Sequence, residues 1–216
     1  MQIPDRRAFA FLLVPIVVLV GMHLFVEAAV RLSDSFPVAL HNRFDLDVEA
    51  NVPAWYSTVL LFTVALAAFV IHRWGAATGS ERRRWPWFWL VMATVFCLIS
   101  LDEAARLHEA IDDAGYPKWV FFYAPLFAGL FAACTYYLFA IRDDPELRRW
   151  IIAGLIVGFG GGVGAESVMH GFELSSRWEE FEVIVEEGLE LVGTSMVLVG
   201  CVHELKRIGA ARRLVR

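Results

Sequence analysis

The stretch 100-SLDEAARLHEAIDD-113 decides how this chain is organised, because it places acids and a histidine at the end of a long apolar run. The groups are Asp102, Glu103, His108 and Glu109. An ionisable side chain in a membrane-spanning segment is costly, and it is usually paired or functional. The stretch therefore predicts a polar site at one end of a hydrophobic bundle.

The composition of the whole chain is typical of a membrane protein. The chain is 58% hydrophobic with a mean hydropathy of +0.55, whereas soluble domains are about 45–50% apolar. Six runs approach the roughly 20 residues that a helix needs to span a bilayer. They cover about 8–30, 53–72, 85–109, 119–141, 150–172 and 183–205. We expect an all-α fold, with residues 1–216 forming a single six-helix transmembrane domain in contact with the lipid bilayer.

The Lys and Arg residues predict the orientation of this domain. With the N-terminus inside, 14 of the 19 fall on the cytoplasmic side, as the positive-inside rule requires. Both termini are then cytoplasmic, and the chain is a multi-pass protein of the bacterial cytoplasmic (inner) membrane. The inner arginines suit anionic headgroups, so no nucleic-acid partner is expected.

Two later segments repeat the pattern of acids beside an apolar run. The first carries Glu166 and His170 in line with glycines at 154, 158 and 162. The second carries Glu186, Glu187 and Glu190. Glu186 and Glu190 lie on the same helix face as the glycines at 193 and 200. Small residues at such spacing let helices approach closely. We therefore expect the acids to face neighbouring helices and not lipid.

A residue count along each helix places the polar groups of four helices in one layer. One polar residue of each helix lies 16 to 18 residues from the nearest cytoplasmic Arg or Lys, which is roughly 24–27 Å along a helix. These four residues are His23, Asp102, Glu166 and Glu190. Glu27 lies on the same face as His23, one turn further on. In a continuous helix His108 and Glu109 would lie roughly 9 Å further out. The sequence thus predicts one site at the outer leaflet.

Other interpretations of these residues stay open. Glu27 can pair with Arg31, and Asp102 with Arg106, each at i,i+4 spacing. Charges near a helix end can also simply reach water. The acids in the connection between the first two spans are expected to face water: Asp45, Asp47 and Glu49.

The predicted ligands favour a divalent metal. Imidazoles with many carboxylates and no thiolate suit Fe, Mn or Zn, and the surplus of carboxylates suits a dinuclear centre. Carboxylates gathered together repel one another unless protons or a cation lie between them. The predicted metal ligands are Asp102, Glu103, His108, Glu109, Glu166, His170, Glu186, Glu187 and Glu190, with His23 and Glu27 as additions. The Glu-x-x-x-His spacing at 166–170 only approximates the Glu-x-x-His pairs of di-iron bundles.

Three stretches resemble a widespread group of bacterial polytopic membrane proteins without an established function. They are LDVEANVPAWYSTVLL (46–61), SLDEAARLHEA (100–110) and VEEGLELVG (185–193). Together they cover most of the outer half of the chain. The resemblance implies that the three stretches form one unit, and it implies no reaction.

The sequence therefore predicts an integral membrane metal-binding protein. As a metalloenzyme it would act on a lipid-soluble or membrane-surface substrate, through metal-bound water or through oxygen chemistry at iron. One alternative is a proton- or cation-coupled transporter or channel, since buried acids and histidines also form relays. Against it, the inner halves of the predicted helices show almost no ionisable groups. Another alternative is a non-catalytic subunit of a larger membrane complex, and oligomers or partner subunits are compatible with the sequence.

Overall fold

A computed structural model of the chain describes residues 5–33, 35–76, 86–113, 120–142, 144–169 and 176–214. Within these residues every regular element is a helix and none is a strand. In chain order the elements are α1 (Asp5–Leu32), α2 (Val38–His41), α3 (Val52–Ala76), α4 (Pro86–Ala105), α5 (Leu107–Asp113), α6 (Val120–Tyr136), the π-helical turn η2 (Tyr137–Ile141), α7 (Pro145–Met169) and α8 (Ser176–Leu214). The predicted all-α class is confirmed for this part of the chain.

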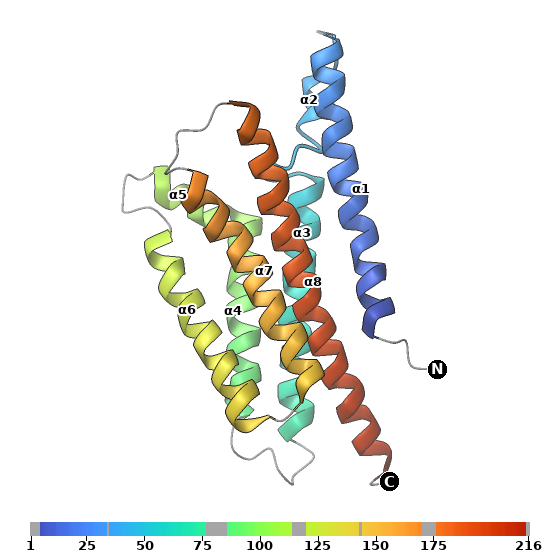
Figure 1. The fold of residues 1–216 in the computed structure, drawn as a ribbon, viewed down its shortest axis with the longest axis vertical. Coiled ribbons are helices and arrows are strands. Elements are labelled where there is room, and N and C mark those ends of the chain that lie inside the picture. The colour runs from blue at the N-terminus through green and yellow to red at the C-terminus, as the bar shows by residue number, and fades with distance from the viewer. Residues whose placement is uncertain are drawn as a thin grey trace.

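The long helices run side by side along the long axis of the molecule (Figure 1). α1 lies on one edge of the bundle and α6 on the other, with α3, α4, α7 and α8 between them. Packing is most extensive between α7 and α8 and between α3 and α4. The start of α1 and the end of α8 lie toward the same end of the bundle, and α2 and α5 lie at the opposite end. This arrangement is the one that an even number of passes requires.

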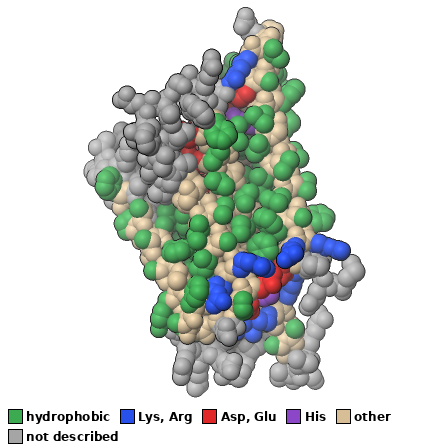
Figure 2. Space-filling model, in the orientation of Figure 1, with side chains coloured by type: hydrophobic (Ala, Val, Ile, Leu, Met, Phe, Trp, Pro, Cys, Tyr) green, Lys and Arg blue, Asp and Glu red, His purple; other side chains and the backbone are tan. Residues whose placement is uncertain are grey.

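Four helical segments of the described residues are long and apolar enough to cross a membrane: Asp5–Leu32, Val52–Gly75, Trp87–Ala105 and Ala124–Ile141. Their outer faces carry exposed apolar side chains, among them Phe11 at 78% and Phe62 at 53% exposure. Figure 2 shows hydrophobic side chains over the middle of one face and charged ones nearer its two ends. Such a surface suits lipid better than water. The fifth and sixth predicted spans correspond to α7 and α8, which are outside this set of four.

The seam between α7 and α8 depends on glycine. A methyl group added at Gly193 of α8 would overlap the backbone of Gly158 and come within 2.6 Å of the Gly154 carbonyl oxygen, both in α7. A methyl group at Gly200 would lie 2.7 Å from Cδ1 of Ile151. Only glycine therefore fits at Gly193 without a shift of the helices. The predicted close approach of the two helices is found at these positions. The surroundings of Gly162 lie outside the described part of the structure.

The predicted continuous helix over 85–109 is wrong, because the chain turns at Arg106. This residue has a φ of 55°, and its N–H donates to the carbonyl of Asp102 at 2.7 Å. A left-handed residue of this kind ends a helix. The Asp102 carboxylate then accepts the N–H of His108 at 2.9 Å, which satisfies a free donor in the first turn of α5. His108 is thus folded back beside Asp102 and does not lie further out.

Ion pairs close the end of the bundle at which α8 ends, a feature that the sequence did not predict. Glu204 is fully buried and accepts hydrogen bonds from Arg207 at 2.8 and 3.1 Å and from Arg142 at 3.4 Å. Close by, Nδ1 of His203 lies 2.7 Å from the carboxylate of Asp5. These contacts tie α1 and the turn before α7 to α8. In the sequence they are scattered over three separate helix ends.

Candidate metal centre

A cavity of about 170 Å³, here named the acidic pocket, lies among α3, α4, α5, α6, α7 and α8. The segment 42–51 closes one side of it. The ionisable residues that line the acidic pocket are Glu49, Asp102, Glu103, His108, Glu186, Glu187 and Glu190. They come from the 42–51 segment, α4, α5 and α8, so groups far apart in the sequence share one space.

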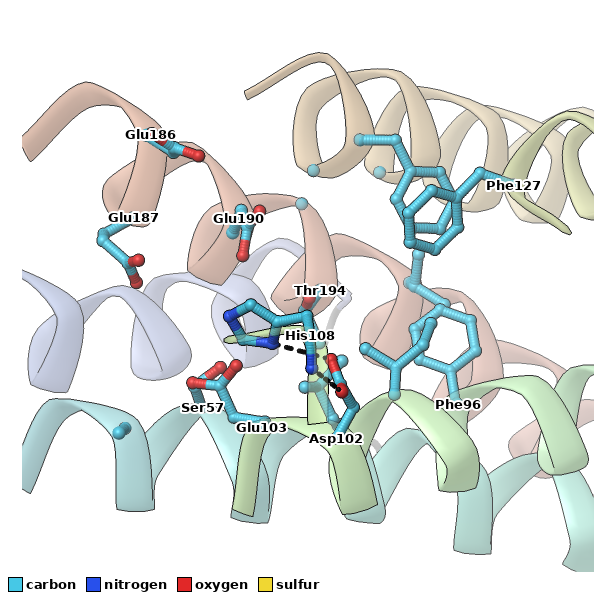
Figure 3. A pocket seen from close by; sticks show the side chains of 18 of the residues that line it. Ser57, Phe96, Asp102, Glu103, His108, Phe127, Glu186, Glu187, Glu190 and Thr194 are labelled. Carbon is cyan, nitrogen blue, oxygen red and sulfur yellow. Dashed lines mark hydrogen bonds and ion pairs between the residues drawn. The ribbon is translucent and has the colours of Figure 1, made fainter. Parts of the chain in front are cut away.

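The acidic pocket has a polar and an apolar side (Figure 3). Glu187 and Glu190 extend from α8 toward Glu103 of α4. Phe96 and Phe127 stand on the opposite side. A ligand in this cavity would therefore meet carboxylates at one end and aromatic rings at the other.

His108 is held between two carboxylates. Its Nδ1 lies 3.0 Å from Asp102 Oδ2, and its Nε2 lies 3.0 Å from Glu49 Oε1. The hydrogen bond to Asp102, reinforced by the charges of Asp102, Glu49 and Glu103 and opposed by burial, raises the pKa of His108 to about 9. At neutral pH the ring is an imidazolium, and the proton on Nε2 points to Glu49.

Negative charge exceeds positive charge in the acidic pocket. Six of its seven ionisable lining residues are carboxylic acids. His108 supplies one positive charge, and Arg106 donates from Nε to Glu49 Oε2 at 2.8 Å. Glu103 accepts a hydrogen bond from the Ser57 hydroxyl. The remaining acids are stable side by side only if they share protons or if a cation lies between them.

The structure brings six of the predicted site residues to this cavity: Asp102, Glu103, His108, Glu186, Glu187 and Glu190. Glu109 and Glu166 lie on α5 and α7, but their side chains are outside the described part, as is the whole of His170. His23 and Glu27 do not line the acidic pocket, and they lie in a separate group that is described below. The reason is that α1 lies at the edge of the bundle, where α8 and α2 cover its inner face.

Sequence reasoning missed Glu49. It was expected to face water with Asp45, yet Glu49 lines the acidic pocket and Asp45 is only 8% exposed. Segment 42–51 has no helical periodicity from which an inward face could be deduced. The one signal in the sequence was that Glu49 falls within the resemblance stretch 46–61 together with Ser57, which is also in the cavity wall.

A second group of ionisable side chains, here named the α1 cluster, consists of His23, Glu27, His41 and Asp45. His23, Glu27 and Asp45 could hold a metal ion, because one donor atom from each lies within 4.8 Å of the others. Nε2 of His41 lies 2.5 Å from Glu27 Oε1. This hydrogen bond raises the pKa of His41, with help from the charges of Glu27 and Asp45 and against desolvation by burial.

Segment 42–51 connects the α1 cluster to the acidic pocket, since it carries Asp45 in the first and Glu49 in the second. Asn51 fixes the segment: its Nδ2 donates to the carbonyls of Asn42 at 3.2 Å and Asp45 at 2.5 Å. Its Oδ1 accepts the N–H of Ala54 at 3.1 Å, at the start of α3. One anchored loop thus contributes a carboxylate to each of the two groups.

A family described as a domain of unknown function, DUF8692, matches the chain over residues 9–205. The chain belongs to this family. The matched span includes both the acidic pocket and the α1 cluster, so the family domain contains both groups. Membership agrees, at the level of the family, with the expected resemblance to proteins of unknown function, and it assigns no reaction. No curated protein and no solved structure matches the chain.

Proposed function

We propose that this protein is a multi-pass membrane protein that binds divalent metal in the acidic pocket. In this proposal α7 and α8 cross the bilayer together with the four apolar segments, which gives six spans. Both termini face the cytoplasm of a bacterial cell, and the acidic pocket opens in the outer leaflet of its inner membrane. The pattern of basic residues supports this orientation.

The observation that carries the proposal is the gathering of six carboxylic acids around one cavity in a helix bundle. Exposed acids could separate into water, but five of these acids are fixed on α4 and α8, which both pack against α3, and Glu49 lies on the segment that Asn51 anchors. A divalent cation compensates their mutual repulsion, and oxygen ligands with an imidazole suit Fe, Mn or Zn. The repulsion between Glu187 and its neighbours Glu186 and Glu190 would then become a shared attraction to the ion.

His108 is the imidazole ligand in this proposal. Asp102 holds its Nδ1, so Nε2 is the nitrogen that faces the acidic pocket and Glu49. A ligating histidine usually donates its other N–H to a carboxylate in this way. The ion would take the place of the Nε2 proton, and Glu49 would turn from a hydrogen-bond acceptor into a ligand.

The carboxylates of the acidic pocket suit a centre with two ions better than a centre with one. Among the described side chains, the one group of three donors within 4.8 Å of each other lies in the α1 cluster and not in the acidic pocket. What favours two ions is the number of acids, because six carboxylates are more than one divalent ion needs. Glu103 and Glu187, which face each other across the cavity, would bridge two ions or bind them through water.

The apolar side of the cavity suits a substrate from the membrane. Phe96 and Phe127 stand opposite the acids, so an apolar chain could lie on the rings while a polar group meets the metal. A metal in this place would activate water or polarise the polar group of the substrate. We propose a metalloenzyme on this basis, with a lipid-soluble or membrane-surface substrate.

A second candidate function is proton- or cation-coupled transport. The observation that favours it is that α8 carries ionisable groups at both ends of the bundle, with the acids at 186–190 near one end and the buried Glu204 near the other. Coupled flux in proteoliposomes that disappears in Glu190→Gln would support transport. Flux that is unchanged in Glu190→Gln would not support it.

Metal analysis of the full chain, purified in detergent without chelator and reconstituted with Mn²⁺, Fe²⁺ or Zn²⁺, tests the main proposal. The variant is Glu187→Gln/Glu190→Gln, which removes two charges and no volume. We expect it to lose most of the metal bound by the acidic pocket, at least about a tenfold loss in affinity. Glu182→Gln is the matched control, because Glu182 lies on the same helix and does not line the cavity. Equal metal content in the three proteins would refute the proposal.

A further inference from the structure

We propose that the acidic pocket binds a membrane molecule with one apolar chain and an uncharged polar head, such as an alcohol, aldehyde, ester or amide, and excludes lipids with an anionic head. The molecule enters sideways from the bilayer, between α4 and α6. This inference rests on the proposed function, because it names the substrate class of the same site. Three features of the cavity support it: its size, the helix beside its apolar lining, and its charge.

The cavity is too small for a whole lipid. Its volume is about 170 Å³. A protein cavity of roughly 150 Å³ holds one benzene molecule, whereas a drug-sized ligand needs about 300–1,000 Å³. The polar head and the first few carbons of one chain therefore fill the space, and the rest of the chain must extend out of the protein.

The edge helix α6 lies beside the path that such a chain would take. The apolar lining of the cavity includes Phe96 and Ile99 of α4, Phe127 of α6 and Phe159 of α7. α6 forms one edge of the bundle (Figure 1), and it packs far less on α4 than α3 does. The apolar lining thus reaches the helix that borders the lipid. A chain that follows these side chains passes between α4 and α6 into the bilayer.

An aromatic pair links α6 to α7 at the cavity. The rings of Phe127 and Phe159 are stacked, with centroids 4.2 Å apart. Burial and dispersion hold such a pair, so an apolar chain can replace one ring as the partner of the other. Pro125 lies two residues before Phe127 inside α6 and has no N–H to donate, which allows the helix to bend there. The passage can therefore widen without the loss of a hydrogen bond between the rings.

The charge of the acidic pocket determines which polar head fits. Six acids face two cationic groups, His108 and the guanidinium of Arg106. Two divalent ions would add four positive charges, so six negative charges would face at most six positive ones. An anionic head gains no net attraction from this arrangement and must displace an acid from the metal. An uncharged oxygen can bind the metal without adding charge.

Without metal, the same charges favour a cationic head. Six acids then exceed two cationic groups, so an ammonium group would take the place of the ion. The preferred head should therefore change from an uncharged one to an ammonium when metal is removed, while an anionic head stays the weakest. Binding that depends on the apolar chain alone would not show this change.

Photolabelling of the full chain in nanodiscs of phosphatidylcholine tests the place of binding. The probe is dodecanol with a diazirine on its fourth carbon. We expect saturable labelling of the cavity wall at Phe96 and Phe159, mapped by mass spectrometry and blocked by unlabelled dodecanol. Phe127→Ala should reduce this labelling at least about threefold, because one wall of the chain site is lost. Phe121→Ala is the matched control, since Phe121 lies on α6 and is 72% exposed.

The labelling of the unchanged protein does not depend on whether a variant folds. Labelling spread evenly over the lipid-facing helices, without competition by dodecanol, would overturn the inference.

Competition by dodecanol, dodecylamine and dodecanoic acid at neutral pH tests the polar head. With Mn²⁺ bound, dodecanol should compete at least about tenfold better than dodecanoate, and in chelator dodecylamine should compete best. Glu187→Gln/Glu190→Gln should reduce the preference for the amine about tenfold, because two negative charges are removed. Glu182→Gln should leave it unchanged. Dodecanoate that competes as well as dodecanol in both states contradicts the proposed substrate class.

The metal content of the same preparations separates this inference from the proposed function. Bound metal without saturable labelling would keep the metal centre and reject the substrate class. Saturable labelling of a protein that binds no metal would keep the chain site and reject the metal centre.

Discussion

At the scale of single residues, Asp102 performs two tasks with one carboxylate. Its Oδ1 accepts the N–H of His108, and its Oδ2 accepts the imidazole Nδ1–H. The first contact starts α5, and the second orients the ring toward Glu49. A residue buried to this degree, at 6% exposure, can keep its charge only because both oxygens are bonded.

We therefore expect Asp102→Asn to lower the metal affinity of the acidic pocket about 10- to 100-fold. An amide has one acceptor oxygen, so it cannot accept both the backbone N–H and the Nδ1–H of His108. Isothermal titration with Mn²⁺ or Zn²⁺ measures the change. Asp47→Asn is the control, since Asp47 is exposed on the neighbouring loop. An unchanged affinity in Asp102→Asn would show that His108 is not a ligand.

The residues that could be predicted from the sequence are those on helices. Asp102, Glu103 and Glu190 stand out because charge is costly beside an apolar run, and helical spacing gives their direction. Glu49 could not be predicted, since it lies on an irregular segment whose direction depends on the contacts of Asn51. Loops carry no periodicity, so their inward residues emerge only from tertiary structure.

At the scale of elements, the break between α4 and α5 shapes the acidic pocket. The sequence around Arg106 has neither Gly nor Pro, so nothing in it signals a helix end. The turn is stabilised by contacts distant in sequence, such as that of Arg106 with Glu49. This is why the predicted depth of His108 was wrong.

Two substitutions at Arg106 separate backbone strain from the ion pair. Arg106→Gly and Arg106→Ala both remove the contact with Glu49, but only Ala has a Cβ that opposes a φ of 55°. We expect Arg106→Ala to be less stable than Arg106→Gly by about 1 kcal/mol. Denaturation in mixed micelles measures the difference. Equal stabilities would mean that the turn is not left-handed in solution.

The α7–α8 seam is the element that could be foreseen best, because glycine spacing predicts a close approach directly. Gly193→Ala should destabilise the protein by about 1–3 kcal/mol, since the new methyl group meets the backbone of Gly158. It should also lower metal binding by displacing the acids of α8. Gly188→Ala on the same helix meets no atom within 4 Å and should be neutral or slightly stabilising. Thermal unfolding of the pair is the measurement, and equal melting temperatures would contradict the seam.

At the scale of the whole molecule, charge and hydrophobicity divide the bundle into layers. The acidic pocket and the α1 cluster lie near the end that carries α2 and α5, and the Glu204 ion pairs lie near the other end. Apolar side chains cover the region between them (Figure 2). Composition predicts this layering, because every helix that crosses a bilayer needs an apolar middle part as long as the hydrocarbon core. It does not predict the pairing of Glu204 with Arg142, which depends on how helix ends meet.

The layering makes the orientation testable with one residue at each end. In a cysteine-free background, a cysteine at the exposed Ala39 of α2 should react with a membrane-impermeant maleimide added to whole cells, and a cysteine at the exposed Ala210 of α8 should react only after the membrane is opened. The reason is that the proposed six-span topology puts 14 of the 19 basic residues on the side of Ala210, and basic loops stay in the cytoplasm. The reverse pattern would place the acidic pocket at the inner leaflet, where its metal would come from the cytoplasm. Labelling of both positions in intact cells would mean that α8 does not end inside the cell, so the six-span topology would be lost even if the metal site remained.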